Sequence, residues 1–176
     1  GEDGVTPLVS IVIPVYNEQD SILPLYRNTR DACAPLGRPF EIIFIDDGSS
    51  DLTFALLAEV HARDASVKVI RFRKNYGQTA AMAAGFRAAR GKIVVSMDGD
   101  LQNDPADIPQ LLAKLEEGYD VVSGWRKDRK DKLFSRRVPS VIANWLIGKL
   151  TGVPIHDNGC SLKAYRADVI KHVALY

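Results

Sequence analysis

Two aspartates, Asp98 and Asp100, follow a short apolar run and are well placed to do chemistry. The run at 93–97 reads Ile-Val-Val-Ser-Met, which predicts a strand buried on both faces of a parallel sheet. Open α/β sheets bind their ligands at the carboxyl ends of such strands. Two carboxylates so close together repel each other, and a divalent cation removes the repulsion; all-oxygen ligands suit Mg²⁺ or Mn²⁺. The sequence therefore predicts a metal site, with a solvated acidic turn as the alternative.

Further polar segments each follow a predicted strand: residues 14–18 (Pro-Val-Tyr-Asn-Glu), 46–51 (Asp-Asp-Gly-Ser-Ser-Asp) and 75–77 (Asn-Tyr-Gly). Tyr16 can offer an aromatic face to a base or a sugar. Either Asp46 or Asp47 can accept a hydrogen bond from a nucleobase N–H or a ribose hydroxyl, while Asp51 is expected to cap a helix. Gly77 is expected at a tight turn into a helix N-terminus that could face phosphate. Sites in this order along one sheet edge predict nucleotide binding.

Strand and helix patterns alternate along the first two thirds of the chain. Strands are expected at 8–15, 41–45, 67–72, 93–97 and 119–123, with helices at 18–34, 51–63, 77–90 and 105–117. Gly91 is expected to cap the third helix at its C-terminus. This βαβα order predicts an α/β fold with a mostly parallel sheet, helices on both faces and right-handed crossovers.

Bulk composition narrows the classes of protein. A chain of 176 residues with 46% hydrophobic and 26% charged residues is ordinary for a soluble globular domain. A net charge of +1 gives no global attraction to nucleic acid or membranes, so partners must be recognised locally. Cys33 and Cys160 are too few for a disulfide framework, and no spacing suggests zinc. No apolar run approaches the roughly 18 residues of a membrane-spanning helix.

The sequence changes character after Gly124. Residues 125–137 hold seven Lys or Arg against two Asp, and an apolar stripe containing Trp145 follows at helical spacing. A basic stretch leading into such a stripe predicts an amphipathic helix, from about Leu133 to Leu150, that lies at a membrane interface. The alternative is an ordinary surface helix packed on its own sheet.

Taken together, these motifs resemble the family 2 glycosyltransferases of GT-A fold, and more narrowly the polyprenyl-phosphate glycosyltransferases related to dolichol-phosphate mannose synthase. The matching segments are residues 14–18, 46–51, 75–81, 98–105, 124–126 and 158–166. The resemblance implies a Rossmann-like GT-A fold and a nucleotide-sugar donor whose anomeric centre is inverted. The chain lacks the Gln-x-x-Arg-Trp motif of processive synthases, and it has Gly99 where mannose synthases commonly have Ala.

The resemblance and the chemistry of the side chains assign expected roles. The metal ligands are Asp98, Asp100 and Gln102. The nucleotide-binding residues are Pro14, Val15, Tyr16, Asn17, Glu18, Asp46, Asp47 and Gly77. The residues for the acceptor phosphate are Arg126, Arg136, Arg137, Ser161 and Lys163. Asp157 matches the catalytic carboxylate of inverting relatives, as a base or as an orienting group; the alternative is a carboxylate that caps its own turn.

The expected activity is metal-dependent, inverting transfer of a sugar from a UDP-sugar, UDP-glucose first, to a polyprenyl phosphate. The alternatives are a GDP-mannose-dependent polyprenyl-phosphate mannosyltransferase and a non-catalytic nucleotide-sugar-binding module. A nucleotidyltransferase is disfavoured because the first strand is not followed by a glycine-rich basic loop.

The resemblance also sets expectations for organisation and location. Residues 1–124 are expected to form the nucleotide-sugar-binding half, and residues 125–176 the acceptor-side and membrane-interface segment of the same catalytic domain. We expect the protein to act at the cytoplasmic face of a membrane and its full-length form to continue into transmembrane helices. Homo-oligomers are possible, and no nucleic-acid partner is expected.

Overall fold

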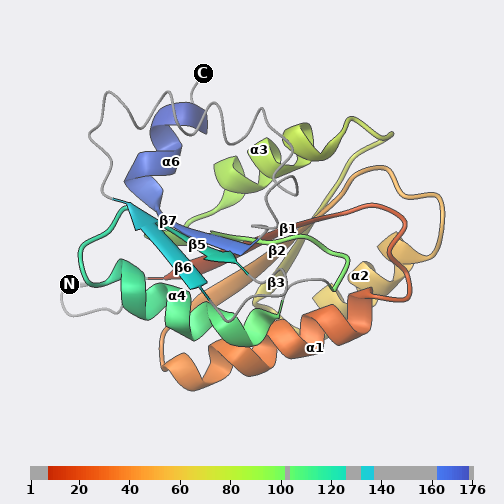
Figure 1. Ribbon diagram of the computed structural model, residues 1–176. Coiled ribbons are helices and arrows are strands. Elements are labelled where there is room, and N and C mark those ends of the chain that lie inside the picture. The colour runs from red at the N-terminus through yellow and green to blue at the C-terminus, as the bar shows by residue number, and fades with distance from the viewer. Residues whose placement is uncertain (1–7, 102–103, 126–131, 137–161, 175–176) are drawn as a thin grey trace, which may run out of the picture.

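The computed structural model describes residues 8–101, 104–125, 132–136 and 162–174, whose strands form one sheet (Figure 1). The strands are β1 (Val9–Val15), β2 (Phe40–Asp46), β3 (Val67–Arg71), β4 (Ile93–Ser96), β5 (Val121–Trp125), β6 (Lys132–Arg136) and β7 (Leu162–Arg166). The helices are α1 (Ile22–Cys33), α2 (Thr53–Arg63), α3 (Gln78–Ala88), α4 (Ile108–Leu115) and α6 (Ala167–Ala174), with 3-10 turns at Ala34–Leu36 and Pro105–Asp107. These bounds confirm the predicted alternation of strands and helices.

The described strands lie in the order β3-β2-β1-β4-β7-β5-β6. The first four are parallel to one another, whereas β7 is antiparallel to both β4 and β5, and β6 is antiparallel to β5. The sheet is therefore mostly parallel, as predicted. Because β7 lies between β4 and β5, residues from the end of the chain complete the middle of the sheet.

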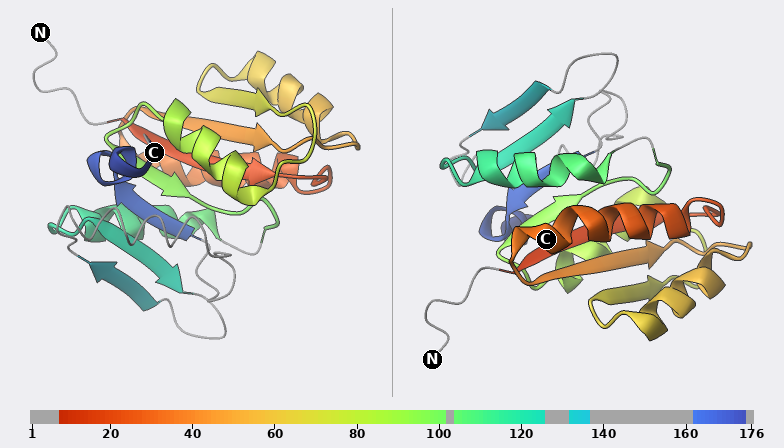
Figure 2. Two further views of the ribbon diagram at one scale, coloured as in Figure 1. Left: turned by 90° about the horizontal axis from the view of Figure 1, so that it is seen from above. Right: turned by 90° about the horizontal axis from the view of Figure 1, so that it is seen from below.

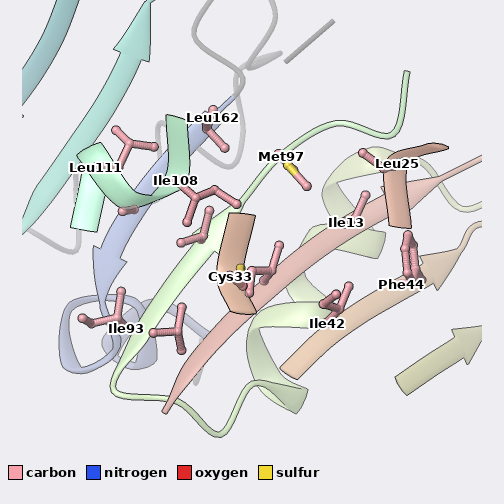
Figure 3. Packing of buried hydrophobic residues seen from close by; sticks show 14 of the residues in the cluster. Ile13, Leu25, Cys33, Ile42, Phe44, Ile93, Met97, Ile108, Leu111 and Leu162 are labelled. Atoms are coloured by element: carbon pink, nitrogen blue, oxygen red, sulfur yellow. The ribbon is translucent and has the colours of Figure 1, made fainter. Parts of the chain in front are cut away.

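Helices cover both faces of the sheet, with α1, α2 and α4 on one face and α3 and α6 on the other (Figures 1 and 2). The alternation of side chains along a strand explains this arrangement. Ile13 of β1 joins the cluster beneath α1 and α4 (Figure 3), as does Ile11, whereas Val12 between them joins the cluster beneath α3. Strands buried on both sides need apolar residues at nearly every position, which is why they read as continuous apolar runs.

Two predicted helix ends are wrong for local reasons. Helix α1 begins at Ile22 and not at residue 18, because residues 18–21 form a turn in which Ser21 and Ile22 donate their N–H groups to the carbonyl of Glu18. Gly91 does not cap α3, whose C-cap is the extended residue Ala89. A Cβ at position 91 would lie 2.4 Å from the carbonyl oxygen of Leu8, so this glycine allows two backbone segments to approach closely.

The expected amphipathic helix does not begin at Leu133, because Lys132–Arg136 form strand β6. This strand pairs with β5 along its whole length, from Trp125 with Lys132 to Val121 with Arg136. The chain thus turns back on β5 as a hairpin before any helix can start. The rest of the predicted helix, residues 137–150, lies outside the described residues. Within the described ranges, every helix is too short or too polar to cross a membrane.

Candidate functional site

A cleft of about 260 Å³ lies just past the carboxyl ends of β1 and β4. Its described lining is Pro14, Val15, Tyr16, Glu18, Asp47, Gln78, Asp98, Gly99 and Asp100. Strand β1 lies between β2 and β4 in the sheet, so the loops after these strands meet at one edge. The structure therefore brings together three of the segments that the sequence marks as candidates.

The cleft is strongly acidic. Its described lining contains four carboxylates, from Glu18, Asp47, Asp98 and Asp100, and neither Lys nor Arg. Partial burial raises the pKa of Glu18, and the nearby charges of Asp100, Asp51 and Asp98 raise it further. The carboxylates of the cleft would repel an anionic ligand unless a cation accompanied it.

The two aspartates predicted to bind metal flank the buried Gly99 at the cleft wall, with Asp98 half-buried and Asp100 exposed. Oxygen donors in an acidic cleft fit a hard divalent cation. Within the described part of the chain, however, no three or more His, Cys, Asp or Glu side chains are grouped closely enough to hold a metal ion. The third expected ligand, Gln102, lies outside the described residues.

Asp46 and Asp47 differ sharply in their surroundings. Asp46 is fully buried; its Oδ1 accepts from the Ser49 N–H at 3.0 Å, and its Oδ2 has no hydrogen-bond partner among the described residues. Asp47 is nearly buried and lines the cleft, and its two oxygens accept from the N–H groups of Tyr76 at 2.8 Å and Gly77 at 3.0 Å. Asp47 thus ties the loop after β2 to the loop after β3.

Asn17 holds two loops together and does not line the cleft. Its Oδ1 accepts from the N–H groups of Ser50 at 2.8 Å and Asp51 at 3.3 Å, and its own N–H donates to Ser49 Oγ at 2.8 Å. Asp51 accepts from the N–H of Thr53, the first residue of α2, at 2.8 Å, but the N-cap of this helix is Leu52, so Asp51 lies one residue before the expected position. Burial alone would raise the pKa of Asp51, but the hydrogen bonds from Thr53 overcome this effect and lower it.

Two tyrosines stand at this edge of the sheet. Tyr16 lines the cleft and is 46% exposed, so its ring is open to a planar ligand. Tyr76 is 57% exposed and packs edge-to-face on Phe72, with 5.6 Å between ring centroids. Gly77 next to it has φ +102° and precedes the first turn of α3, which confirms the predicted turn into a helix.

The residues expected to bind the acceptor are only partly described. Lys163 lies on β7, paired with Ser96 and Ser123 of the neighbouring strands, and is 4% exposed. Arg136 ends strand β6. Asp157, Arg126, Arg137 and Ser161 lie outside the described residues.

Sequence reasoning missed Gln78. This first residue of α3 lines the cleft, and its Nε2 donates to Asp98 Oδ1 at 2.8 Å. A signal was present, because Gln78 directly follows the Gly77 turn within the 75–81 motif. Nothing in the local sequence indicated that this turn faces the end of β4.

Comparison with known proteins gives consistent matches. Residues 10–174 match the family model described as Glycosyl transferase family 2. The dodecaprenyl-phosphate galacturonate synthase of Rhizobium johnstonii is 47% identical over 169 residues, which are 95% of this chain and 50% of that protein. The undecaprenyl-phosphate 4-deoxy-4-formamido-L-arabinose transferase of Pseudomonas aeruginosa is 47% identical over 165 residues, 93% of this chain and 48% of that protein. The chain therefore spans about half the length of these curated relatives.

Solved structures share the fold. A mannosyltransferase from Pyrobaculum calidifontis, solved with GDP-Man and Mn²⁺, superposes with a TM-score of 0.68 at 17% identity, covering 97% of this chain and 47% of that one. This likeness and the strand order confirm the predicted Rossmann-like GT-A fold. Because the family model matches residues 10–174, almost the whole chain, the chain belongs to glycosyl transferase family 2.

Proposed function

We propose that this chain binds a nucleoside-diphosphate sugar together with a divalent cation and transfers the sugar to a polyprenyl phosphate. The observation that carries the proposal is the acidic cleft at the carboxyl ends of β1 and β4, whose described lining has four carboxylates and no basic side chain. A diphosphate is itself anionic, so such a cleft would favour it only together with a cation that offsets the repulsion.

On the donor side, Asp98, Asp100 and Gln102 would hold the cation, which supplies Lewis-acid stabilisation of the departing diphosphate. Tyr16 offers its exposed ring to the base or sugar. We propose that Asp46 or Asp47 accepts from a nucleobase N–H or a ribose hydroxyl; of the two, Asp47 lines the cleft, whereas Asp46 is fully buried. The remaining donor contacts are proposed for Pro14, Val15, Glu18 and Gly77.

On the acceptor side, the chemistry demands orientation more than activation. A phosphate monoester has a second pKa near 6, so its oxygens are largely ionised and nucleophilic at pH 7. Arginine suits phosphate through its planar fork of donors. We propose that the acceptor phosphate is bound and oriented by Arg126, Arg136, Arg137, Ser161 and Lys163. We assign Asp157 the role of base or orienting carboxylate.

The lipid acceptor is proposed from the relatives, which are named as dodecaprenyl-phosphate and undecaprenyl-phosphate enzymes. For the donor we propose a UDP-sugar. The choice of UDP over GDP rests on the resemblance to bacterial lipid-phosphate glucosyltransferases. UDP-glucose is the first candidate, and the names of the relatives add galacturonate and 4-deoxy-4-formamido-arabinose as sugars to compare.

The acceptor keeps its tail in a bilayer, so the reaction must take place at a membrane surface. We propose that residues 125–176 form the acceptor side of the domain and that residues 1–124 form the donor side. The basic run at 126–137 then faces anionic headgroups at the cytoplasmic surface.

The test is a transfer assay with vesicles containing undecaprenyl phosphate and a panel of UDP- and GDP-sugars with Mg²⁺ or Mn²⁺. A lipid-linked monosaccharide of inverted anomeric configuration, formed from a UDP-sugar, supports the proposal. Transfer from GDP-mannose alone would overturn the nucleotide assignment. Donor binding without transfer to any lipid would overturn the proposed reaction.

A further inference from the structure

Two carboxylates from neighbouring strands meet at the start of helix α3. Asp47, which follows β2, accepts from the N–H groups of Tyr76 and Gly77 immediately before the helix. Asp98, which follows β4, accepts from the side chain of Gln78, the first residue of the helix. The two contacts are adjacent in sequence, so the first fixes the backbone from which the second is made.

The backbone before α3 has little freedom to move. Gly48 has φ +75°, and a Cβ at that position would lie 2.3 Å from the carbonyl carbon of Lys74. The loops after β2 and β3 are therefore in direct contact, and Asn75 Nδ2 adds a hydrogen bond to the Asp47 carbonyl at 3.3 Å. A side chain that starts from so constrained a turn can hold a carboxylate in one orientation.

The chemistry of the Gln78 contact suits a metal ligand. An ionised carboxylate only accepts hydrogen bonds, so the amide of Gln78 must present its NH₂ group to Asp98. A neutral donor orients the carboxylate without cancelling its charge, whereas a Lys or Arg in its place would compete with a cation. Gln78 is itself exposed and lines the cleft beside Asp98 and Gly99.

We propose that Gln78 is a positioning residue: it holds Asp98 in the orientation that binds the divalent cation, from a helix start that Asp47 fixes. This inference rests on the proposed function, in which Asp98 is a cation ligand. It assigns no direct donor contact to Gln78, although the side chain lies in the cleft.

The test replaces Gln78 by Met, which has nearly the same shape and cannot donate. Mn²⁺ affinity is measured by electron paramagnetic resonance with saturating UDP, and UDP affinity is measured separately by calorimetry in EDTA. The control variant is Gln110→Met, the same change at an exposed position on α4 outside the cleft lining. Thermal unfolding of each variant reports on the fold.

We expect Gln78→Met to weaken Mn²⁺ binding by about tenfold or more, since loss of an outer-shell partner typically costs 10–100-fold. UDP affinity in EDTA and the thermal midpoint should match those of the Gln110→Met control. Unchanged Mn²⁺ affinity would overturn the inference while leaving the proposed function in place. Loss of UDP affinity in EDTA would show a direct donor contact instead, and would also overturn it.

The wild-type protein separates this inference from the proposed function. If wild-type protein with UDP binds no Mn²⁺, the proposed function fails first, and the role of Gln78 fails with it. If the wild type binds Mn²⁺ and the Gln78→Met and Gln78→Glu variants bind it equally well, only the positioning role is wrong. Gln78→Glu should bind Mn²⁺ with altered affinity, because it replaces the donor with a second carboxylate beside Asp98.

Discussion

Gly99 lies between the two aspartates of the cleft, and one added methyl group at this position should measurably lower the free energy of unfolding. A Cβ there would lie 2.6 Å from Val15 Cγ1 and 3.1 Å from the carbonyl oxygen of Pro14. The first distance is 0.8 Å inside the 3.4 Å at which ordinary contact begins (3.4 − 2.6). Val15 is 3% exposed and belongs to the core cluster, so it cannot simply turn into solvent. We therefore predict that Gly99→Ala is destabilising.

The size of the effect follows from packing. Overfilling a close-packed site costs about 1–3 kcal/mol. Val15→Ala removes two methyl groups and costs about 1.6 kcal/mol or more. If the two effects were independent, the double variant Gly99→Ala/Val15→Ala would lose about 3–5 kcal/mol. In that variant, however, the new methyl group at position 99 occupies space that the Val15 side chain vacates. The double variant should therefore be more stable than the sum predicts, by about 1 kcal/mol or more.

Urea unfolding followed by circular dichroism measures these free energies, provided that the denaturant slopes agree. Gly124→Ala is the matched control, because a Cβ there would meet its nearest atom, the Leu162 carbonyl oxygen, at an ordinary 3.7 Å. Because Gly124 lies within strand β5, alanine there should leave the free energy of unfolding unchanged or raise it by up to about 1 kcal/mol. A Gly99→Ala variant as stable as this control, or a strictly additive double variant, would refute the packing argument.

Three further predictions concern charge. Burial would raise the pKa of Glu41, but hydrogen bonds from Lys68, Ser10 and Arg90 lower it below the ordinary value of 4.5. The ionised Glu41 therefore stabilises the fold above that pH, and this stabilisation is lost as the pH falls through the lower pKa of the folded state. Acid titration of unfolding free energy should thus be steeper for wild type than for Glu41→Gln, and parallel curves would contradict this. Asp157→Asn should lower kcat on the order of 10²-fold with UDP affinity unchanged, and normal turnover would remove Asp157 from the mechanism. Reversing Arg136 and Arg137 to Glu should weaken low-salt binding to anionic vesicles at least about tenfold, and unchanged binding would rule out docking through this run.

Much of the fold could be predicted because burial leaves a local signature. Strand β4 (Ile93–Ser96), predicted at 93–97, is an apolar run because helices cover both faces of the sheet, and its end coincides with the cleft. The insertion of β7 between β4 and β5 could not be predicted in this way. It depends on a contact between segments about 70 residues apart in sequence, which local periodicity does not encode.

The site was predictable at the level of segments but not of individual atoms. Asp46 and Asp47 are adjacent in sequence, yet one points into the interior and the other ties down the start of α3. That division depends on which loops meet at the sheet edge. The Gln78 contact with Asp98 was missed for the same reason, since its two partners lie 20 residues apart.

The central claim is that a cation makes the acidic cleft bind a nucleoside diphosphate, and calorimetry of UDP with Mn²⁺ or with EDTA tests it most directly. We predict that Mn²⁺ tightens UDP binding to the wild-type chain by at least about tenfold, or about 1.4 kcal/mol. In Asp100→Ala this gain should be lost, while binding in EDTA stays the same or improves because one repelling charge is removed. Equal UDP affinity with and without Mn²⁺, or a full Mn²⁺ effect in Asp100→Ala, would contradict the claim.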